Sequence, residues 1–335
     1  MNTLESKNRF VNIDGLRTIA CIGIVLMHIM TNINYSLQLV VIPKVIDQFG
    51  NFVFLFMIIS SFAMCCGYYD KFKNNTIDTE MYYSKRVKKI LPFFLFLVVV
   101  DVITEHNLSS VIEGFADSTL LFGFIQKEIS VIGVAWFLGL IFIFYIMFPY
   151  FVYLFSNKKR AWIVTFFAAL MNITSIYYFN IERSNMFYSF IYFCIGGLIY
   201  LYRDSIIKFC KNYKIIGLIS VILSICFYCI IPMDNEYLIL LKTGVVAFSI
   251  LLYAISYKSI LLGNRITKFI GNISFEIYLC HMVVFRIIEK LKLTHVVNNN
   301  FLSYVIVFSL VFCGSVILSI IFKTIYSLFS RKVIK

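Results

Sequence analysis

Long apolar stretches alternate with short polar ones along almost the whole chain. Ten of the apolar stretches approach the ~20 residues that a helix needs to cross a membrane. They cover residues 14–33, 49–68, 90–104, 135–155, 161–179, 187–202, 215–231, 238–256, 273–289 and 301–325. The connection over residues 105–134 is the longest, and a re-entrant eleventh segment within it is a further interpretation. The pattern predicts an all-α fold, a polytopic membrane helical bundle of about ten transmembrane helices.

The composition agrees with a membrane bundle and argues against a water-soluble fold. Of the 335 residues, 61% are hydrophobic, against roughly 45–50% in soluble domains, and only 14% are charged. No internal repeat or low-complexity tract divides the sequence, so we expect one membrane-embedded domain over residues 1–335 and no separate soluble domain. The nine cysteines lack the spacing of a metal site, and we expect buried thiols and no bound metal.

The basic residues lie mostly on alternate sides of the apolar stretches. With the N-terminus in the cytoplasm, 23 of the 30 Lys and Arg residues fall on the inner side. The positive-inside rule therefore places both termini in the cytoplasm. This distribution explains the net charge of +13, so we exclude nucleic acid as a partner and expect membrane lipids instead. The first apolar stretch lacks a small-residue cleavage pattern, and we interpret it as a retained helix rather than a signal peptide.

The first predicted span, GLRTIACIGIVLMH, contains both an arginine and a histidine. Arg17 and His28 are 11 residues apart. In an α-helix this spacing is about 20° from three full turns, with a rise of about 16 Å. Both residues therefore lie on one face, Arg17 near the inner surface and His28 near mid-membrane. Asp14 is placed to pair with Arg17, and Thr31 and Asn32 continue the polar face.

Ionisable residues at this depth normally face a cavity or a polar partner. One interpretation is structural: Arg17 extends to lipid headgroups and His28 bonds a neighbouring helix. The other is catalytic, because histidine is a base near neutral pH and arginine stays charged and holds phosphate or carbonyl groups. The presence of both residues on one face favours the catalytic interpretation and indicates acyl or proton transfer.

The predicted loop over residues 69–89 ends in a cluster of four cations: Lys85, Arg86, Lys88 and Lys89. One interpretation of this cluster is an anchor for anionic lipid headgroups. The other is a site for a polyphosphate such as coenzyme A at the inner mouth of the bundle.

Polar positions also occur in the fourth, eighth and ninth spans. Trp136, at the start of the fourth, fits either an interfacial aromatic belt or a substrate site. The ninth span carries three candidate residues: Glu276, Tyr278 and His281. By helical rise His281 is about 12 Å deep, comparable with His28, so we expect the two histidines to line one cavity. Lys242 in the eighth span either extends outward or lines the same cavity.

Together these segments resemble the acyltransferase-3 family of integral-membrane acyltransferases. The first predicted helix, within FVNIDGLRTIACIGIVLMH, contains the Arg-x10-His pattern. The basic motif and Pro92 begin the third predicted helix, and the segment WFL begins the fourth. The segment GNISFEIYLCH lies near the end of the chain. The resemblance covers nearly the whole chain in the right order. It implies a ten-helix bundle that takes an acyl group from cytoplasmic acyl-CoA and delivers it to a hydroxyl, usually on an extracytoplasmic glycan.

By the same resemblance, His28 is the essential base or acyl relay and Arg17 is its partner. The family's arginine-x-x-arginine motif for coenzyme A corresponds to Arg86 and Lys89, where lysine keeps the charge and loses the planar guanidinium fork. A second departure is Ser61, where many relatives have glycine. Larger members carry a C-terminal hydrolase-like domain. For this chain we expect either direct transfer by the membrane domain or completion by a separate protein.

We therefore expect a membrane-bound O-acyltransferase in the bacterial plasma membrane, with acetyl-CoA as the donor. The expected acceptor is a capsular, exo- or cell-wall polysaccharide, extracytoplasmic or lipid-linked, and proteins of polysaccharide synthesis or export are candidate partners. The expected site comprises catalytic His28 and Arg17, coenzyme A-binding Lys85, Arg86 and Lys89, and substrate-binding Trp136, Glu276, Tyr278 and His281. Two alternatives stay open: a proton-coupled transporter or flippase, and a non-catalytic partner of a polysaccharide assembly complex.

Overall fold

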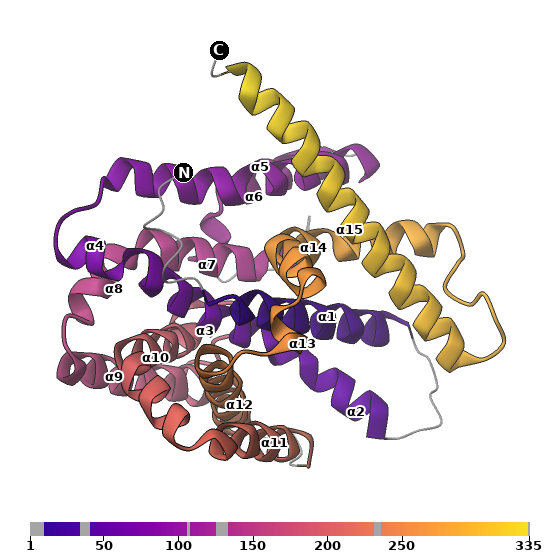
Figure 1. Cartoon of the computed structure of the whole chain (residues 1–335). Coiled ribbons are helices and arrows are strands. Elements are labelled where there is room, and N and C mark those ends of the chain that lie inside the picture. Colours follow the sequence, from indigo (N-terminus) through magenta and orange to yellow (C-terminus); the bar gives the residue numbers. More distant parts are fainter. Residues whose placement is uncertain (1–9, 34–40, 106–107, 125–132, 231–235, 334–335) are drawn as a thin grey trace.

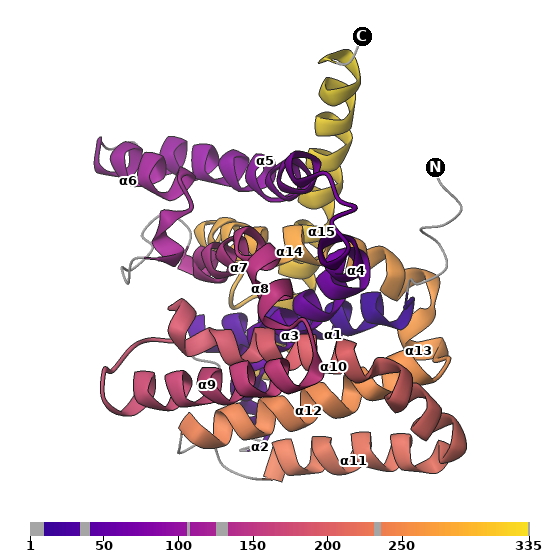
Figure 2. The ribbon, with the colours of Figure 1, turned by 90° about the vertical axis from the view of Figure 1, so that its left-hand side faces the viewer.

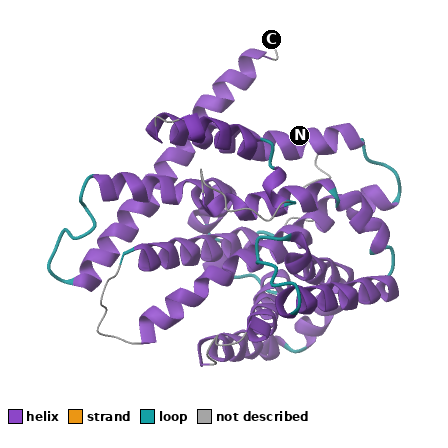
Figure 3. Cartoon of the chain, turned by 180° about the vertical axis from the view of Figure 1, so that it is seen from behind, coloured by secondary structure: helices purple, strands orange, loops and turns teal. Residues whose placement is uncertain are grey.

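The described part of the chain is made of helices and connecting loops, without strands (Figure 3). A computed structural model describes residues 10–33, 41–105, 108–124, 133–230 and 236–333. The α-helices are α1 (Asn12–Asn32), α2 (Val41–Asp47), α3 (Phe52–Met64), α4 (Asp70–Lys73), α5 (Thr79–Glu105), α6 (Leu108–Ser118), α7 (Trp136–Ile146), α8 (Phe148–Leu154), α9 (Lys158–Tyr177), α10 (Met186–Asn212), α11 (Lys214–Ile230), α12 (Glu236–Ser256), α13 (Ile260–Gly263), α14 (Arg265–Lys290) and α15 (Asn300–Val333). Four shorter segments complete them: η2 (Gln48–Asn51), η4 (Leu121–Gly123) and η5 (Gly133–Ala135) are 3₁₀ turns, and η3 (Cys65–Tyr69) is a π-helix.

Seven helical stretches within the described residues are long and apolar enough to cross a membrane. They are Asn12–Asn32, Ile42–Lys73, Lys158–Tyr177, Met186–Asn212, Leu238–Ser256, Arg265–Lys290 and Asn300–Leu328. An eighth is the pair Gly133–Ile146 and Phe148–Leu154, which is bent by 60°. Two further predicted spans fall in α5, whose apolar part lies between Lys89 and Asp101, and in α11, which has 17 residues. The chain is an all-helical, multi-pass membrane protein.

The helices are arranged in layers around α1 and α3. Figures 1 and 2 show α1 and α3 between α7 and α14 on one side and α10 and α12 on the other. The hairpin of α5 and α6 lies beyond α7 and α14, and α11 covers the opposite edge of the molecule. The helix α3 packs closely on α10, where the Ser61 hydroxyl donates a hydrogen bond of 2.6 Å to the Phe193 carbonyl. Ser61 thus contributes a helix-to-helix bond that glycine cannot make.

The connection over residues 105–134 contains a second arm of a helical hairpin. The 11-residue helix α6 folds back along α5, and Gly114 lies against Val98 and Val102. Its small and polar residues face α5, whereas Ile112 and Phe115 are exposed. An ion pair of 2.9 Å between Asp101 and Arg286 joins α5 to α14 and ties the hairpin to the bundle. A re-entrant eleventh segment within this connection stays a prediction, and residues 125–132 of it lie outside the described part of the chain.

The cationic cluster lies on a helix and not in the loop that we predicted over residues 69–89. The helix α5 begins at Thr79, well before Pro92, and the Asp78 carboxylate accepts a hydrogen bond from the Met81 amide in its first turn. An aspartate before a helical segment with an acidic first turn is a capping signal that could have located this start from the sequence. Because the cluster is helical, Lys85 and Lys89 share one face, four residues apart.

Candidate functional site

The helices α1 and α14 lie side by side and run in the same direction. The Thr18 hydroxyl donates to the Thr267 carbonyl at 2.8 Å, near the start of both helices. Further along, about one turn before the end of α1 and two and a half turns before the end of α14, the His28 and His281 rings lie 5.1 Å apart between centroids. These two contacts show that the polar face of α1 lies along α14 from near the start of both helices to the histidines.

A glycine allows the two helices to approach. A β-carbon on Gly271 would overlap the Asp14 carbonyl oxygen, which is part of the α1 backbone. Backbone cannot move aside as a flexible side chain can, so any larger residue must separate α1 from α14.

We expect Gly271→Ala to lower the free energy of unfolding by about 1–3 kcal/mol, the usual range for overpacking. Gly244→Ala is the matched control, because its β-carbon would meet only the Ile195 side chain at 3.8 Å. Melting temperatures of the two purified variants measure the difference. A Gly244→Ala protein that is destabilised as much as Gly271→Ala would contradict this account of the helix contact.

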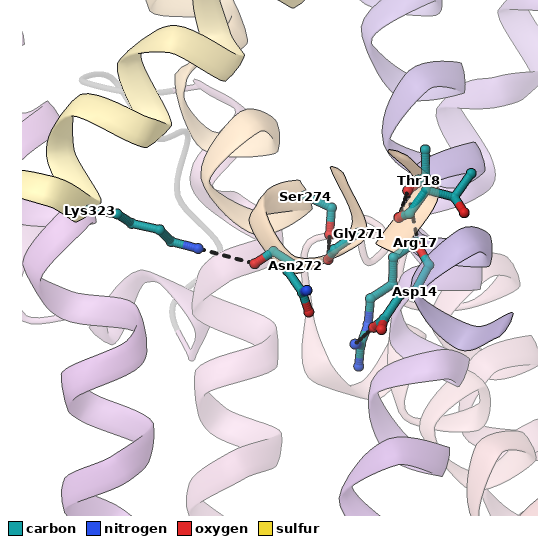
Figure 4. Close-up of polar contacts among 8 residues, drawn as sticks. Asp14, Arg17, Thr18, Gly271, Asn272, Ser274 and Lys323 are labelled. Carbon is teal, nitrogen blue, oxygen red and sulfur yellow. Dashed lines mark hydrogen bonds and ion pairs between the residues drawn. The ribbon is translucent and has the colours of Figure 1, made fainter. Parts of the chain in front are cut away.

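Arg17 is held at the start of α1 by a buried carboxylate. Its guanidinium lies 3.2 Å from Asp14 Oδ1, and the Asp14 side chain is only 3% exposed (Figure 4). Thr18 donates a further hydrogen bond of 3.1 Å to the Asp14 carbonyl. The predicted pair of Asp14 and Arg17 is therefore present, and it orients the guanidinium.

The Arg17 side chain lines a cavity, here called the central cavity, with about 730 Å³ of empty space including its open mouth. Two cations, Arg17 and Lys89, lie among its lining residues together with the polar Asn272 and Ser274. Lys323 is close by: its ammonium donates to the Asn272 carbonyl at 3.1 Å (Figure 4). The polar part of the cavity therefore carries positive charge and suits an anionic or carbonyl-bearing ligand.

Lys89 differs from an ordinary surface lysine. Its side chain is exposed and lines the cavity, where neighbouring protein groups partly desolvate the ammonium. This desolvation, followed by the positive charges of Arg17 and Arg86, lowers the pKa of Lys89 to about 8. A bound anion would therefore stabilise the protonated form of Lys89.

Three aromatic rings, here called the aromatic wall, close the cavity at greater depth: Phe56, Phe137 and Tyr278. The ring centroids of Phe137 and Tyr278 are 5.6 Å apart, and those of Phe56 and Phe137 are 6.3 Å apart. Tyr278 follows Asn272 by six residues on α14, a rise of about 9 Å from the cavity's polar part. Beyond it lies His281, with ring centroids 6.0 Å apart. The wall lies between the polar part of the central cavity and the two histidines.

The surroundings of His281 fix the position of its proton. Its Nδ1 lies 2.6 Å from the Tyr278 carbonyl oxygen, which can only accept a hydrogen bond. In the neutral ring the proton is therefore on Nδ1, and Nε2 presents a lone pair. That Nε2 is buried and has no hydrogen-bond partner among the described residues. This unpaired, buried nitrogen is available to accept a hydrogen bond from His28 or from a ligand hydroxyl.

Two further residues, Trp136 and Arg183, lie near the histidine pair. The guanidinium of Arg183 stacks over the Trp136 ring at 5.4 Å, and its charge also acts on His28. Trp136 adjoins Phe137 of the aromatic wall, with ring centroids 6.1 Å apart. The histidine pair thus lies near both the aromatic wall and a Trp–Arg pair.

A comparison with protein-family models matched one model, described as an acyltransferase domain of the acyltransferase-3 type, to residues 10–321. This is nearly the whole chain. The chain belongs to the acyltransferase-3 family. Searches with this chain among the curated proteins and among the solved structures found no match.

Within this acyltransferase-3 chain the structure brings together most of the predicted site residues. Arg17, Lys89 and Tyr278 line the central cavity. His28 and His281 are paired beyond it, and Trp136 is next to the wall. Two contributors were missed, Lys323 and Arg183. The sequence signals for them were only their positions: Lys323 is near the end of the last predicted span, and Arg183 is in the short connection between the fifth and sixth.

Three predicted residues lie elsewhere. Glu276 faces α15, where one carboxylate oxygen pairs with Lys323 at 2.8 Å. Arg86 donates to the Tyr68 hydroxyl at 2.6 Å and stacks on tyrosine rings. Lys85, on the same helix, lines a separate cavity. The arginine and lysine of the motif thus diverge in this structure: Lys89 points into the central cavity, and Arg86 packs behind it.

Lys242 occupies neither of the two places expected for it. It is fully buried on α12, and its ammonium lies 3.4 Å from the Gln48 side-chain oxygen and 5.1 Å from the centre of the Tyr228 ring. These contacts connect α12 to η2 and α11, away from the residues that line the central cavity. Its surroundings are those of a structural group that joins helices.

Proposed function

We propose that this protein is an O-acyltransferase that moves an acyl group, acetyl in the simplest case, from cytoplasmic acyl-CoA to a hydroxyl of an extracytoplasmic or lipid-linked glycan. One observation carries the proposal: the cavity lined by Arg17 and Lys89 lies along α1 and α14, the two helices that also bring together the half-buried His28 and the buried His281. The cavity suits the donor, and the histidine pair is at the position where the acyl group would be transferred.

In this proposal the acyl-CoA enters from the side where α1 and α14 begin. Ten spans with both termini in the cytoplasm would place that side inside the cell. Arg17 holds the donor through its carbonyl or phosphate oxygens, and Lys89 adds a second charge in the partly dehydrated cavity. The thioester passes the aromatic wall to meet His28, while the acceptor hydroxyl approaches from the side of Trp136 and Arg183.

The reaction needs one base and one acid, and His28 acts in turn as both. His28 removes the proton of the acceptor hydroxyl as its oxygen attacks the thioester carbonyl carbon. The carbon–sulfur bond then breaks, and the coenzyme A sulfur takes the proton from the His28 imidazolium. His281 Nε2, which is without a partner among the described residues, would accept a hydrogen bond from the second nitrogen of His28 and so hold that ring in one tautomer. A covalent acetyl-His28 intermediate would use the same residues.

The proposal is tested with the purified full chain and labelled acetyl-CoA. Appearance of label on a glycan acceptor, with equimolar free coenzyme A, would support acyl transfer. A protein that releases no coenzyme A and transfers no label, but changes the export or amount of polymer in cells, would favour the transporter or the assembly partner instead.

A pH effect follows from Lys89. A bound polyanion favours the ammonium form, so binding should take up a proton above pH 8, where free Lys89 is mostly neutral. Donor affinity should be independent of this group below pH 8 and should fall as the pH rises above it. Calorimetry in two buffers of different ionisation enthalpy measures the uptake. Lys89→Met should abolish it, and proton release by the wild-type protein near pH 8.5 would contradict the assignment.

A further inference from the structure

A groove, here called the side groove, lies where α4 and the start of α9 meet α10 (Figure 1). It contains about 990 Å³ of empty space, including its open part. The apolar helical stretch Ile42–Lys73 ends at this groove, and the stretch Lys158–Tyr177 begins at it. Because both stretches are long enough to cross a membrane, the side groove lies at a membrane surface. Among the described residues, none lines both the side groove and the central cavity.

The side groove carries an excess of positive charge. Its charged lining residues are four cations and one carboxylate: Lys73, Lys158, Lys159, Arg203 and Asp70. The carboxylate is already engaged, because the Tyr200 hydroxyl donates to Asp70 Oδ2 at 3.0 Å. No carboxylate in the described part of the chain forms an ion pair with Lys158 or Lys159. The two ammonium groups can therefore take an anionic partner from outside the protein.

Tyrosine rings of α10 hold two of the cations in place. The Lys158 ammonium lies 4.5 Å from the ring centre of Tyr202, and the Arg203 guanidinium lies 4.1 Å from that of Tyr200. A ring face attracts a cation without neutralising its charge. The cations are therefore positioned at the groove and keep their full charge for a ligand.

The side groove adjoins an apolar track on the exposed face of α9. Lys158 and Trp162 are about one turn apart, and the Trp162 indole donates at 3.0 Å to the hydroxyl of Tyr202, the same tyrosine that contacts Lys158. Phe166 follows after a further turn and is 61% exposed, while Trp162 is 56% exposed. In a membrane this face of α9 meets lipid chains. A ligand of the groove thus finds positive charge for its head and an apolar surface for a tail.

We propose that the side groove binds the head group of an anionic membrane phospholipid, whose phosphate contacts Lys158, Lys159 and Arg203 and whose acyl chains lie along α9. A zwitterionic head group would bring its own cation against four others, whereas an anionic head group has none. A soluble phosphate would use the cations and leave the apolar track unused. The positive-inside prediction places the groove in the cytoplasmic leaflet, which carries anionic lipids. Bound there, the lipid joins the ends of two membrane-spanning stretches.

The test measures the binding of labelled phosphatidylglycerol to the purified full chain in micelles of a neutral detergent. Lys158→Gln with Lys159→Gln removes two charges and keeps most of the side-chain length, and it should weaken binding about tenfold or more. Lys158→Arg with Lys159→Arg keeps the charges and should bind as the wild type does. The matched control is Lys208→Gln with Lys211→Gln, two exposed cations of α10 outside the groove lining. It should change the affinity by less than about twofold.

Displacement of the label distinguishes the possible ligands. Unlabelled phosphatidylcholine should displace it at least about tenfold less well than unlabelled phosphatidylglycerol, and glycerol phosphate, the soluble head group, should not displace it at the same concentration. Equal displacement by phosphatidylcholine would overturn the preference for an anionic head group. Equal displacement by glycerol phosphate would overturn the lipid and assign the groove to a soluble phosphate. Unchanged binding in the Lys158 and Lys159 glutamine variant, or an equal loss in the Lys208 and Lys211 control, would overturn the site itself.

Discussion

Replacement of His28 by alanine is expected to lower acyl transfer by at least about 100-fold, the lower end of what a general base contributes. The imidazole is the only base that the proposed mechanism places between donor and acceptor, and it lies against His281 at 5.1 Å. Because His28 does not line the central cavity, acetyl-CoA affinity should change by less than about twofold. The rate and the affinity are measured on the purified protein.

His295→Ala is the matched control for this variant. His295 is exposed in the loop between α14 and α15, so its replacement should leave the transfer rate unchanged. A His28→Ala protein that folds, binds acetyl-CoA and still transfers at the wild-type rate would remove His28 from the chemistry. His281 would then be the remaining candidate base on this face.

Arg17→Met is expected to have the second largest effect, on both donor use and stability. It removes one of the two cations that line the central cavity, and kcat/KM for acetyl-CoA should fall by about tenfold to 100-fold. It also removes the guanidinium partner of the buried Asp14 carboxylate, which should cost about 1.5–3 kcal/mol of folding free energy. The melting temperature and the kinetic constants are measured in parallel.

Asp14→Asn in the Arg17→Met background separates the two effects. The double variant no longer buries a carboxylate without its guanidinium partner, so stability should recover at least in part. Donor use should stay low, because the cavity still lacks the arginine. Recovery of kcat/KM together with stability would show that Arg17 acts only by supporting the fold.

Helical periodicity was sufficient to predict the pairing within α1 and its relation to α14. An α-helix fixes which residues share a face, so Asp14, Arg17 and His28 could be placed from spacing alone. Equal depth in two spans suggested that His28 and His281 would meet, and their rings do lie together. These predictions needed only the geometry of a single helix and the depth of each residue in the membrane.

The contacts that depend on packing between distant segments could not be obtained in this way. Nothing in the sequence indicates that the Gly271 position adjoins the Asp14 backbone, since the two are far apart along the chain. The direction of Arg86 is set by tyrosines from η3, α5 and α7 together. A cation cluster read as a loop motif therefore predicted the right charge and the wrong local structure.

Cells provide the most direct test of the central claim. Surface polysaccharide would be analysed by mass spectrometry after deletion of the gene and after its return as the wild type or as His28→Ala. The account predicts that an acyl mass increment disappears on deletion and returns only with the wild-type protein. An increment that persists in the deleted strain, or that His28→Ala restores in full, would contradict it.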